Sequence, residues 1–296
     1  MPCTEPDRRT DSADLSRRDF VRAAVGSGFA AAVLPVTAQT IKTDSTGLSV
    51  VEVTIPAGDF KLPAYRAMPE GKSAADKLPV VLVVSEIFGV HEHIADVARR
   101  FAKLGYLAIA PELFVRQGDA QSYGEVGKLI AEVVNKVPDA QAMTDLDACV
   151  AWARANGGDS GKLAITGFCW GGRITWLYTA HNPGVKAAVA WYGQLVGAPS
   201  ELKPKNPIDV AGALNAPVLG LYGAEDPGIP VAAVDQMKAA LAKAGERSAA
   251  ARASQFVVYP GAAHAFHADY RPSYQKAAAE DGWKRCVAWF RANGVA

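Results

Sequence analysis

Three side chains that could act together as a nucleophile, a base and an orienting acid each follow a separate apolar segment of the chain. Cys169 lies in the turn Gly167-Phe-Cys-Trp-Gly-Gly172, Asp226 comes later in the chain, and His264 comes last. A cysteine attacks as its thiolate, a histidine can take up and return a proton, and a carboxylate can orient that histidine. The three positions together predict nucleophilic chemistry at a carbonyl carbon.

The turn around Cys169 has the composition of a sharp strand-to-helix corner. The central residue of such a corner has a strained backbone, and neighbouring side chains would collide with the strand and the helix. Gly167 and Gly171 remove those collisions. The thiol would then lie near a helix N-terminus, whose N–H groups and dipole favour a thiolate. A buried cysteine that serves only as a small apolar residue is the alternative reading of the turn alone.

The elements that must position these residues form an alternating series. Strands are predicted over 49–55, 60–66, 79–84, 106–110, 163–166, 185–191, 217–222 and 255–259, and helices over 94–104, about 122–135, 139–155, 172–180, 231–244 and 274–292, with a surface connection over 246–253. The first two strands alternate and read as an antiparallel edge, whereas the later apolar runs suit buried parallel strands. The order nucleophile, acid, histidine on such a series predicts an α/β-hydrolase fold with about eight strands in a mostly parallel sheet, flanked by helices on both faces.

Four further positions at predicted strand ends could complete a site. Glu86 follows the strand 79–84 and could be the partner of the Cys169 thiol, although a solvated loop glutamate fits as well. The backbone N–H groups of Ile87 and Trp170 are placed to form an oxyanion hole. Arg116, in the loop after the fourth strand, could bind a substrate carboxylate, and a solvated arginine is equally compatible with the sequence.

The composition indicates an ordinary globular protein, and we expect neither a metal nor a cofactor. The 296 residues carry a net charge of +1, and no block of basic residues suggests nucleic acid. His91 and His93 lack a third nearby ligand, so we expect no metal there. The four cysteines have neither the paired spacing of a zinc site nor that of a redox motif.

The N-terminus has the pattern of an export signal. Ser16-Arg17-Arg18-Asp19-Phe20-Val21-Arg22 matches the twin-arginine motif, and a weakly apolar run and the small residues Val36-Thr37-Ala38 follow it. We therefore expect a signal peptide over 1–38, recognition by the twin-arginine export machinery, and a single periplasmic domain over 39–296 without a permanent membrane anchor. A basic tail with a chance pair of arginines is the alternative. Removal of the signal leaves three cysteines, so at least one thiol stays free.

The quoted motifs resemble those of the dienelactone hydrolase (carboxymethylenebutenolidase) family. The resemblance runs from about Leu48 to the C-terminus and rests on Ser85-Glu86-Ile87-Phe88-Gly89, Phe114-Val115-Arg116-Gln117, the turn at Cys169, Gly223-Ala-Glu-Asp226 and Ala263-His264-Ala-Phe266-His267. It implies that Cys169 is the nucleophile, His264 its base, Asp226 the orienting acid, and Glu86 a carboxylate that exchanges protons with the thiol. It also implies that Arg116 is one of two arginines that hold the dienelactone carboxylate.

The second arginine of the family is absent, because its position holds Ala268; Arg271 lies nearby and could compensate. Tyr192 and Phe266 complete the expected substrate-binding set. We therefore predict a hydrolase of small esters or lactones that forms an acyl thioester. A non-catalytic periplasmic binding protein on the same fold and a thiol redox protein are the rival interpretations. Filled triad positions argue against the first, and the lack of a nearby resolving cysteine argues against the second.

Overall fold

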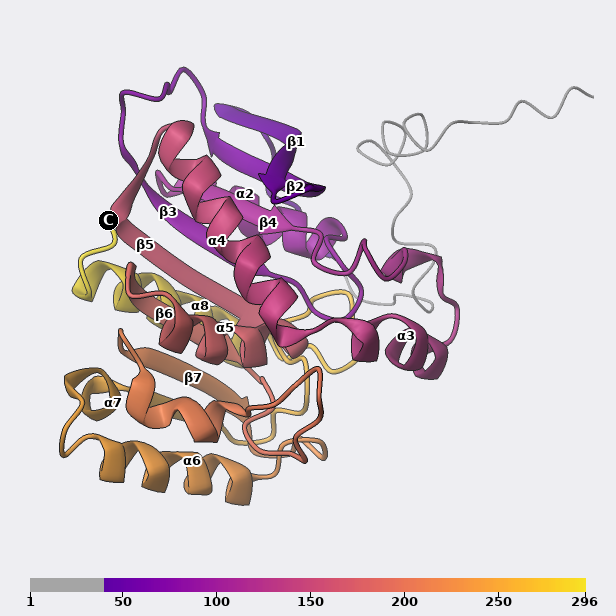
Figure 1. Cartoon of the computed structure of the whole chain (residues 1–296), viewed down its shortest axis with the longest axis vertical. Helices are drawn as coiled ribbons and strands as arrows, with labels where there is room; N and C mark the ends of the chain where they lie inside the picture. The colour runs from indigo at the N-terminus through magenta and orange to yellow at the C-terminus, as the bar shows by residue number, and fades with distance from the viewer. Residues whose placement is uncertain (1–39) are drawn as a thin grey trace, which may run out of the picture.

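The structure is a computed structural model, and it describes residues 40–296 (Figure 1). The predicted signal peptide over 1–38 and the predicted start near Gln39 lie outside the described residues. Within the described part of the chain, no helix is long and apolar enough to cross a membrane.

A single eight-stranded sheet forms the centre of the described part. Its strands are β1 (Leu48–Ala57), β2 (Phe60–Pro69), β3 (Leu78–Val84), β4 (Leu107–Pro111), β5 (Gly158–Phe168), β6 (Val185–Trp191), β7 (Val218–Gly223) and β8 (Gln255–Tyr259). Their spatial order is β1-β2-β4-β3-β5-β6-β7-β8. β1 and β2 pair antiparallel, β2 also runs antiparallel to β4, and all later pairs are parallel. The predicted mostly parallel sheet with an antiparallel edge is confirmed.

Helices cover both faces of this sheet, as Figure 1 shows. They are α2 (Glu92–Lys103), α3 (Val126–Glu132), α4 (Asp139–Ala155), α5 (Trp170–His181), α6 (Val231–Ala244), α7 (Ala249–Ala253) and α8 (Lys276–Ala292), with 3-10 turns η2 (Ala120–Ser122), η3 (Val134–Lys136) and η4 (Pro207–Ala213). α2 and α8 pack together through Phe101 and Trp283, whose ring centroids are 4.6 Å apart. On the opposite face, α5 packs on the sheet through Trp176, which stacks on Phe256 of β8. The predicted α/β-hydrolase fold is therefore present.

Two predicted elements differ from the structure. The single helix expected over 122–135 is divided into η2, α3 and η3, and Val133 between α3 and η3 has a φ of −120°. Gly124 and Gly127 lie in this stretch, and glycine weakens a helix interior by about 1 kcal/mol relative to alanine. The surface connection expected over 246–253 contains the short helix α7, in which the Ser248 hydroxyl accepts a hydrogen bond from the N–H of Ala251. Neither difference moves a strand end.

Candidate active site

Cys169 occupies a sharp corner between β5 and α5. Its φ of 55° and ψ of −113° lie in a region that side-chain-bearing residues rarely adopt. The corner is possible because two glycines permit very close backbone contacts. A Cβ atom on Gly167 would lie 2.2 Å from the carbonyl oxygen of Gly171, and one on Gly171 would lie 2.3 Å from that of Val84. The predicted sharp strand-to-helix corner at Cys169 is therefore present.

His264, in the loop after β8, is hydrogen-bonded to Asp226, in the loop after the adjacent strand β7. The imidazole Nδ1 lies 2.6 Å from Asp226 Oδ2, so Nε2 is left for the cysteine. Asp226 is buried, and its Oδ1 accepts hydrogen bonds from the N–H groups of Gly228 and Ile229 at 2.9 and 3.1 Å. These contacts hold the Asp226 carboxylate in place. A carboxylate that is fixed in this way can orient the histidine ring.

The charge state of this pair favours a protonated imidazole. Burial alone would lower the pKa of His264, but hydrogen bonds to Asp226 and to Cys169 raise it from its ordinary 6.5 to about 10. Burial alone would raise the pKa of Asp226. The hydrogen bond from His264 and the positive charge of that imidazole outweigh burial, so the pKa of Asp226 is lowered. An imidazolium beside the cysteine stabilises a thiolate by charge.

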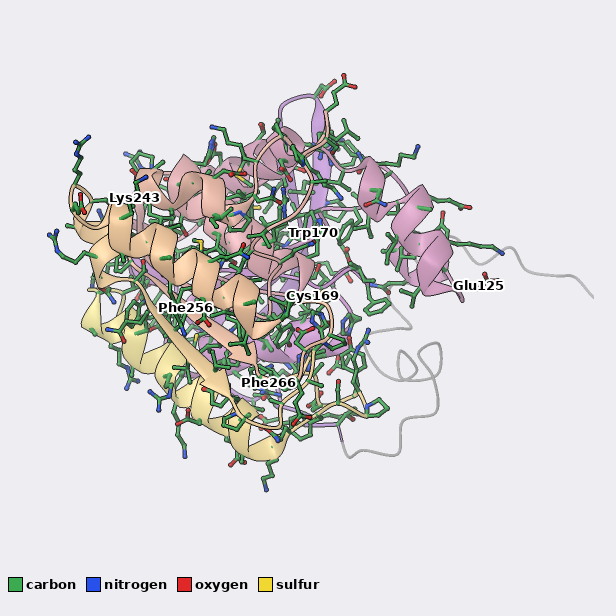
Figure 2. All side chains as sticks on the ribbon, turned by 90° about the horizontal axis from the view of Figure 1, so that it is seen from below. Glu125, Cys169, Trp170, Lys243, Phe256 and Phe266 are labelled. Carbon is green, nitrogen blue, oxygen red and sulfur yellow. The ribbon has the colours of Figure 1, made fainter. Side chains whose placement is uncertain are left out.

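A cleft of about 840 Å³ opens above the thiol. Its residues around the reacting group are Ile87, Cys169, Trp170, Tyr192, Ile229 and His264. Each comes from the carboxyl end of a parallel strand or from the loop that follows, the edge at which open α/β sheets bind ligands. In Figure 2, Cys169 and Trp170 lie between Lys243 on α6 and Glu125, which precedes α3. Five segments that are distant in sequence thus meet at one edge.

The comparisons with known proteins agree with this geometry. The model of the dienelactone hydrolase family matches residues 62–294. A Methylorubrum extorquens protein named "Putative carboxymethylenebutenolidase" is 60% identical over 284 residues, 95% of this chain and 94% of its own length. A Salmonella typhimurium protein of the same name is 54% identical over 268 residues, 90% of this chain and 96% of its own length. The chain belongs to the dienelactone hydrolase family. It is a carboxylic ester or lactone hydrolase of the carboxymethylenebutenolidase type.

A solved structure of a family member has the same fold. The crystal structure of a "Putative Dienelactone Hydrolase" from Klebsiella pneumoniae is 55% identical, with a TM-score of 0.78 over 82% of this chain and 98% of that one. The sequence-based identification of the family and of the fold is therefore confirmed.

Two residues that line the cleft, Ile87 and Trp170, have backbone N–H groups that donate none of the loop and cap hydrogen bonds found among the described residues. Trp170 is the first residue of α5, where the N–H has no partner within the helix. Ile87 lies in the loop after β3 and lines the same cleft. Both positions agree with the predicted oxyanion hole.

Glu86, which could be the partner of the Cys169 thiol, is hydrogen-bonded to two other side chains. Its Oε2 lies 2.9 Å from Nε2 of His91 and accepts a hydrogen bond from the Tyr270 hydroxyl at 2.8 Å. Burial would raise the pKa of Glu86, but the hydrogen bond and charge of His91 outweigh it and lower the pKa to about 2. The buried carboxylate is thus held ionised by partners other than the thiol.

The two histidines considered as metal ligands have different partners. His91 binds Glu86, and the Nδ1 of buried His93 lies 2.9 Å from Asp269 Oδ1. Among residues 40–296, no group of three His, Cys, Asp or Glu side chains has the geometry to hold a metal ion.

Arg116 is held outside the cleft, so the structure does not support its predicted role as a carboxylate clamp. Both terminal nitrogens of its guanidinium bind the buried carboxylate of Asp145, one of them at 2.7 Å. The guanidinium also lies 4.0 Å from the ring centroid of Phe60. Arg116 does not line the cleft that contains Cys169. Its partner Asp145 lies 29 residues away on α4, which no local motif indicates.

The other expected substrate contacts are divided between the cleft and the core. Tyr192 lines the cleft, and its ring contacts His264 at a centroid distance of 5.2 Å. Phe266 is fully buried against Tyr192 and two further aromatic rings, so it is a core residue instead of a substrate contact. Arg271 lies 4.8 Å from the ring centroid of Phe88 and does not line the cleft. Ala268 is fully buried.

Sequence reasoning missed several residues of the site. Tyr270 holds Glu86, and the loop 194–206 forms a wall of the cleft and brings Lys203 into it. The signal for this loop was available, because it leaves the end of strand β6 at the same sheet edge as Cys169.

Proposed function

We propose that the enzyme cleaves small esters or lactones through a covalent thioester on Cys169, with His264 as acid and base and Asp226 as the orienting acid. One observation carries this proposal: Cys169 lies on the strained corner at the base of the cleft, beside a histidine that a buried aspartate orients. The burial of the other two free cysteines agrees with it, because burial raises the pKa of the Cys149 and Cys286 thiols far above the usual value.

The acylation step follows from this placement. The thiolate of Cys169 adds to the carbonyl carbon, and the carbonyl electron pair moves to the oxygen, where the N–H groups of Ile87 and Trp170 stabilise the oxyanion. When the carbonyl forms again, the carbon–oxygen bond to the leaving alkoxide breaks, and the His264 imidazolium gives it a proton. A lactone keeps this new hydroxyl in the acyl group.

The deacylation step regenerates the starting pair. Neutral His264 takes a proton from water as the water oxygen attacks the thioester carbon. The carbon–sulfur bond then breaks, the acid leaves, and Cys169 returns as a thiolate beside the imidazolium. The hydrogen bond to Asp226 keeps Nε2 of the ring directed at the reacting groups throughout.

The test uses two variants of the nucleophile. Cys169→Ala should lower the hydrolysis of p-nitrophenyl acetate by at least about 100-fold with an unchanged unfolding curve, because only the thiol is removed. Cys169→Ser should also be nearly inactive, since a hydroxyl is a far weaker acid than a thiol. Mass spectrometry of the rapidly quenched wild type should show one added acetyl group on the peptide with Cys169. Substantial turnover by Cys169→Ala would refute the mechanism.

We also propose that the precursor is exported in the folded state to the periplasm through Arg17 and Arg18. The twin-arginine motif, the apolar run and the small residues before Gln39 support this. Replacing both arginines by lysine should keep the precursor in the cytoplasmic fraction, with the mature protein of the wild type beginning near Gln39. Normal periplasmic protein from the double variant would contradict the assignment.

A further inference from the structure

The wall of the cleft that faces α3 is built from two segments that are tied together. The loop 194–206 follows β6, and its Leu202 carbonyl accepts a hydrogen bond of 2.9 Å from the N–H of Asp139 at the start of α4. Ser200 and Lys203 exchange two backbone hydrogen bonds, at 3.0 and 3.1 Å. Ile130, Val134 and Asn135 line the cleft from α3 and η3. The position of Lys203 is therefore fixed by its backbone.

Lys203 brings an ammonium group without a carboxylate partner into this cleft. Its Nζ donates one hydrogen bond, at 3.0 Å, to the side-chain oxygen of Asn135. In residues 40–296, no carboxylate oxygen lies within 4.0 Å of it. An ammonium has three donors, and leaving a partly buried one unpaired costs free energy. Burial, and then the nearby charge of Arg173, lower the pKa of Lys203.

Among the described charged side chains that line the cleft, one cation has no carboxylate partner. Arg173 also lines it, but both of its terminal nitrogens bind Asp139, at 2.6 and 2.8 Å, and one also binds the Lys205 carbonyl. The lining has one acidic side chain, Glu201, which is exposed. The charge of Arg173 is thus compensated by Asp139, and Lys203 is the cation of the cleft lining that can still pair with a ligand.

Two further donors, on residues that line the same cleft, lack acceptors among the described residues. The indole N–H of Trp170 and the hydroxyl of Tyr192 are buried, both side chains are more than nine-tenths buried, and neither atom has a hydrogen-bond partner among the described residues. Buried donors are normally satisfied, so their presence in a cleft indicates a ligand with acceptor atoms.

We propose that Lys203 determines specificity by binding a carboxylate of the substrate while the ester carbonyl lies over Cys169. This inference rests on the proposed function, and it moves recognition of the anion from the loop after β4, which carries Arg116, to the loop after β6. A point charge on a fixed loop orients an anionic substrate without taking part in the chemistry.

The kinetic test compares two chromogenic esters of similar size, p-nitrophenyl hemiglutarate with a free carboxylate and neutral p-nitrophenyl butyrate. The wild type should prefer the hemiglutarate. Lys203→Met should lower kcat/KM for it by about ten- to a hundredfold, mainly through KM, and leave the butyrate nearly unchanged. Lys205→Met is the matched control, because Lys205 is exposed, lies two residues away and does not line the cleft.

A binding measurement separates this inference from the mechanism. In the Cys169→Ala background, calorimetry with glutarate should show weaker binding by a similar factor when Lys203→Met is added. Equal effects on both esters, no effect on either, or an unchanged glutarate affinity would overturn the role of Lys203. Turnover by Cys169→Ala would refute the thioester mechanism, and the glutarate measurement would still decide the role of Lys203.

Discussion

Asp226→Asn isolates the contribution of the ion pair behind the nucleophile. Asparagine has the same shape, and its oxygen can still accept the N–H groups that bind Oδ1, so the loop should keep its conformation. The negative charge that faces Nδ1 of His264 is lost. The amide can also favour the wrong tautomer of the imidazole, in which Nε2 no longer serves Cys169.

The magnitude follows from the pKa of His264. A rise from 6.5 to about 10 corresponds to at most about 5 kcal/mol. The His264 side chain is 34% exposed, so water screens part of this energy. The rest of the stabilisation of the protonated imidazole comes from Asp226 and Cys169 together. About 1.4–2 kcal/mol for Asp226 is reasonable, which is about a ten- to thirtyfold loss of the thiolate–imidazolium pair. The tautomer effect adds to it.

The assay is a pH–rate profile with p-nitrophenyl acetate, together with titration of the thiolate by its ultraviolet absorbance. A histidine whose pKa is raised keeps its proton, and with it the stabilised pair, until the pH rises through the folded-state value of about 10. In Asp226→Asn this alkaline limb should move down by at least one pH unit, and kcat/KM at neutral pH should fall by at least about tenfold. KM should change little, because Asp226 does not line the cleft.

Glu225→Gln, an exposed neighbour, is the control. An unchanged alkaline limb with unchanged kcat/KM would show that the ion pair has no catalytic role.

Three further predictions concern stability. Gly171→Ala places a Cβ 2.3 Å from the Val84 carbonyl oxygen, so urea unfolding should show a loss of about 1–3 kcal/mol or more, and an unchanged midpoint would contradict the close contact. Arg116→Ala leaves the carboxylate of buried Asp145 unpaired and should lower the free energy of unfolding by about 3–5 kcal/mol. The ratio of kcat/KM for the anionic and neutral esters should stay constant. A selective loss on the anionic ester would show instead that Arg116 binds the substrate carboxylate. Burial raises the pKa of Glu112 to about 7, so its ionisation destabilises the fold as the pH rises from about 4.5 through 7. Glu112→Gln should therefore stabilise the protein by up to about 3 kcal/mol at pH 8 and by little at pH 4; equal effects at both pH values would exclude this charge as the cause.

The sequence was sufficient for the sheet and for the sharp corner at Cys169. Continuous apolar runs predicted the buried parallel strands because both faces of these strands must be covered. The glycines around Cys169 predicted the corner because only glycine tolerates backbone contacts that close. These features are local, so a single sequence contains them.

The roles of charged residues outside the corner could not be predicted in the same way. Arg116 is paired with Asp145 across 29 positions, and Glu86 with Tyr270 across 184. An unpaired arginine in a cleft and one paired with a buried aspartate have the same local sequence. Their difference lies in long-range contacts, and the burial of the partner decides which state is stable.

The topology explains how substrate recognition can move while the chemistry stays. All parallel strands of this sheet end at one edge, so each following loop can reach the cleft that contains Cys169. In the proposed assignment, the loop after β4 stabilises the fold through Arg116 and Asp145, and the loop after β6 binds the anion through Lys203. The proposed nucleophile Cys169, with His264 and Asp226, comes from other loops, so an exchange of the anion-binding residue leaves these three in place. The family likeness therefore fixes the reaction more firmly than the substrate, and the ratio of kcat/KM for carboxylated and neutral esters is the quantity that distinguishes members with different recognition loops.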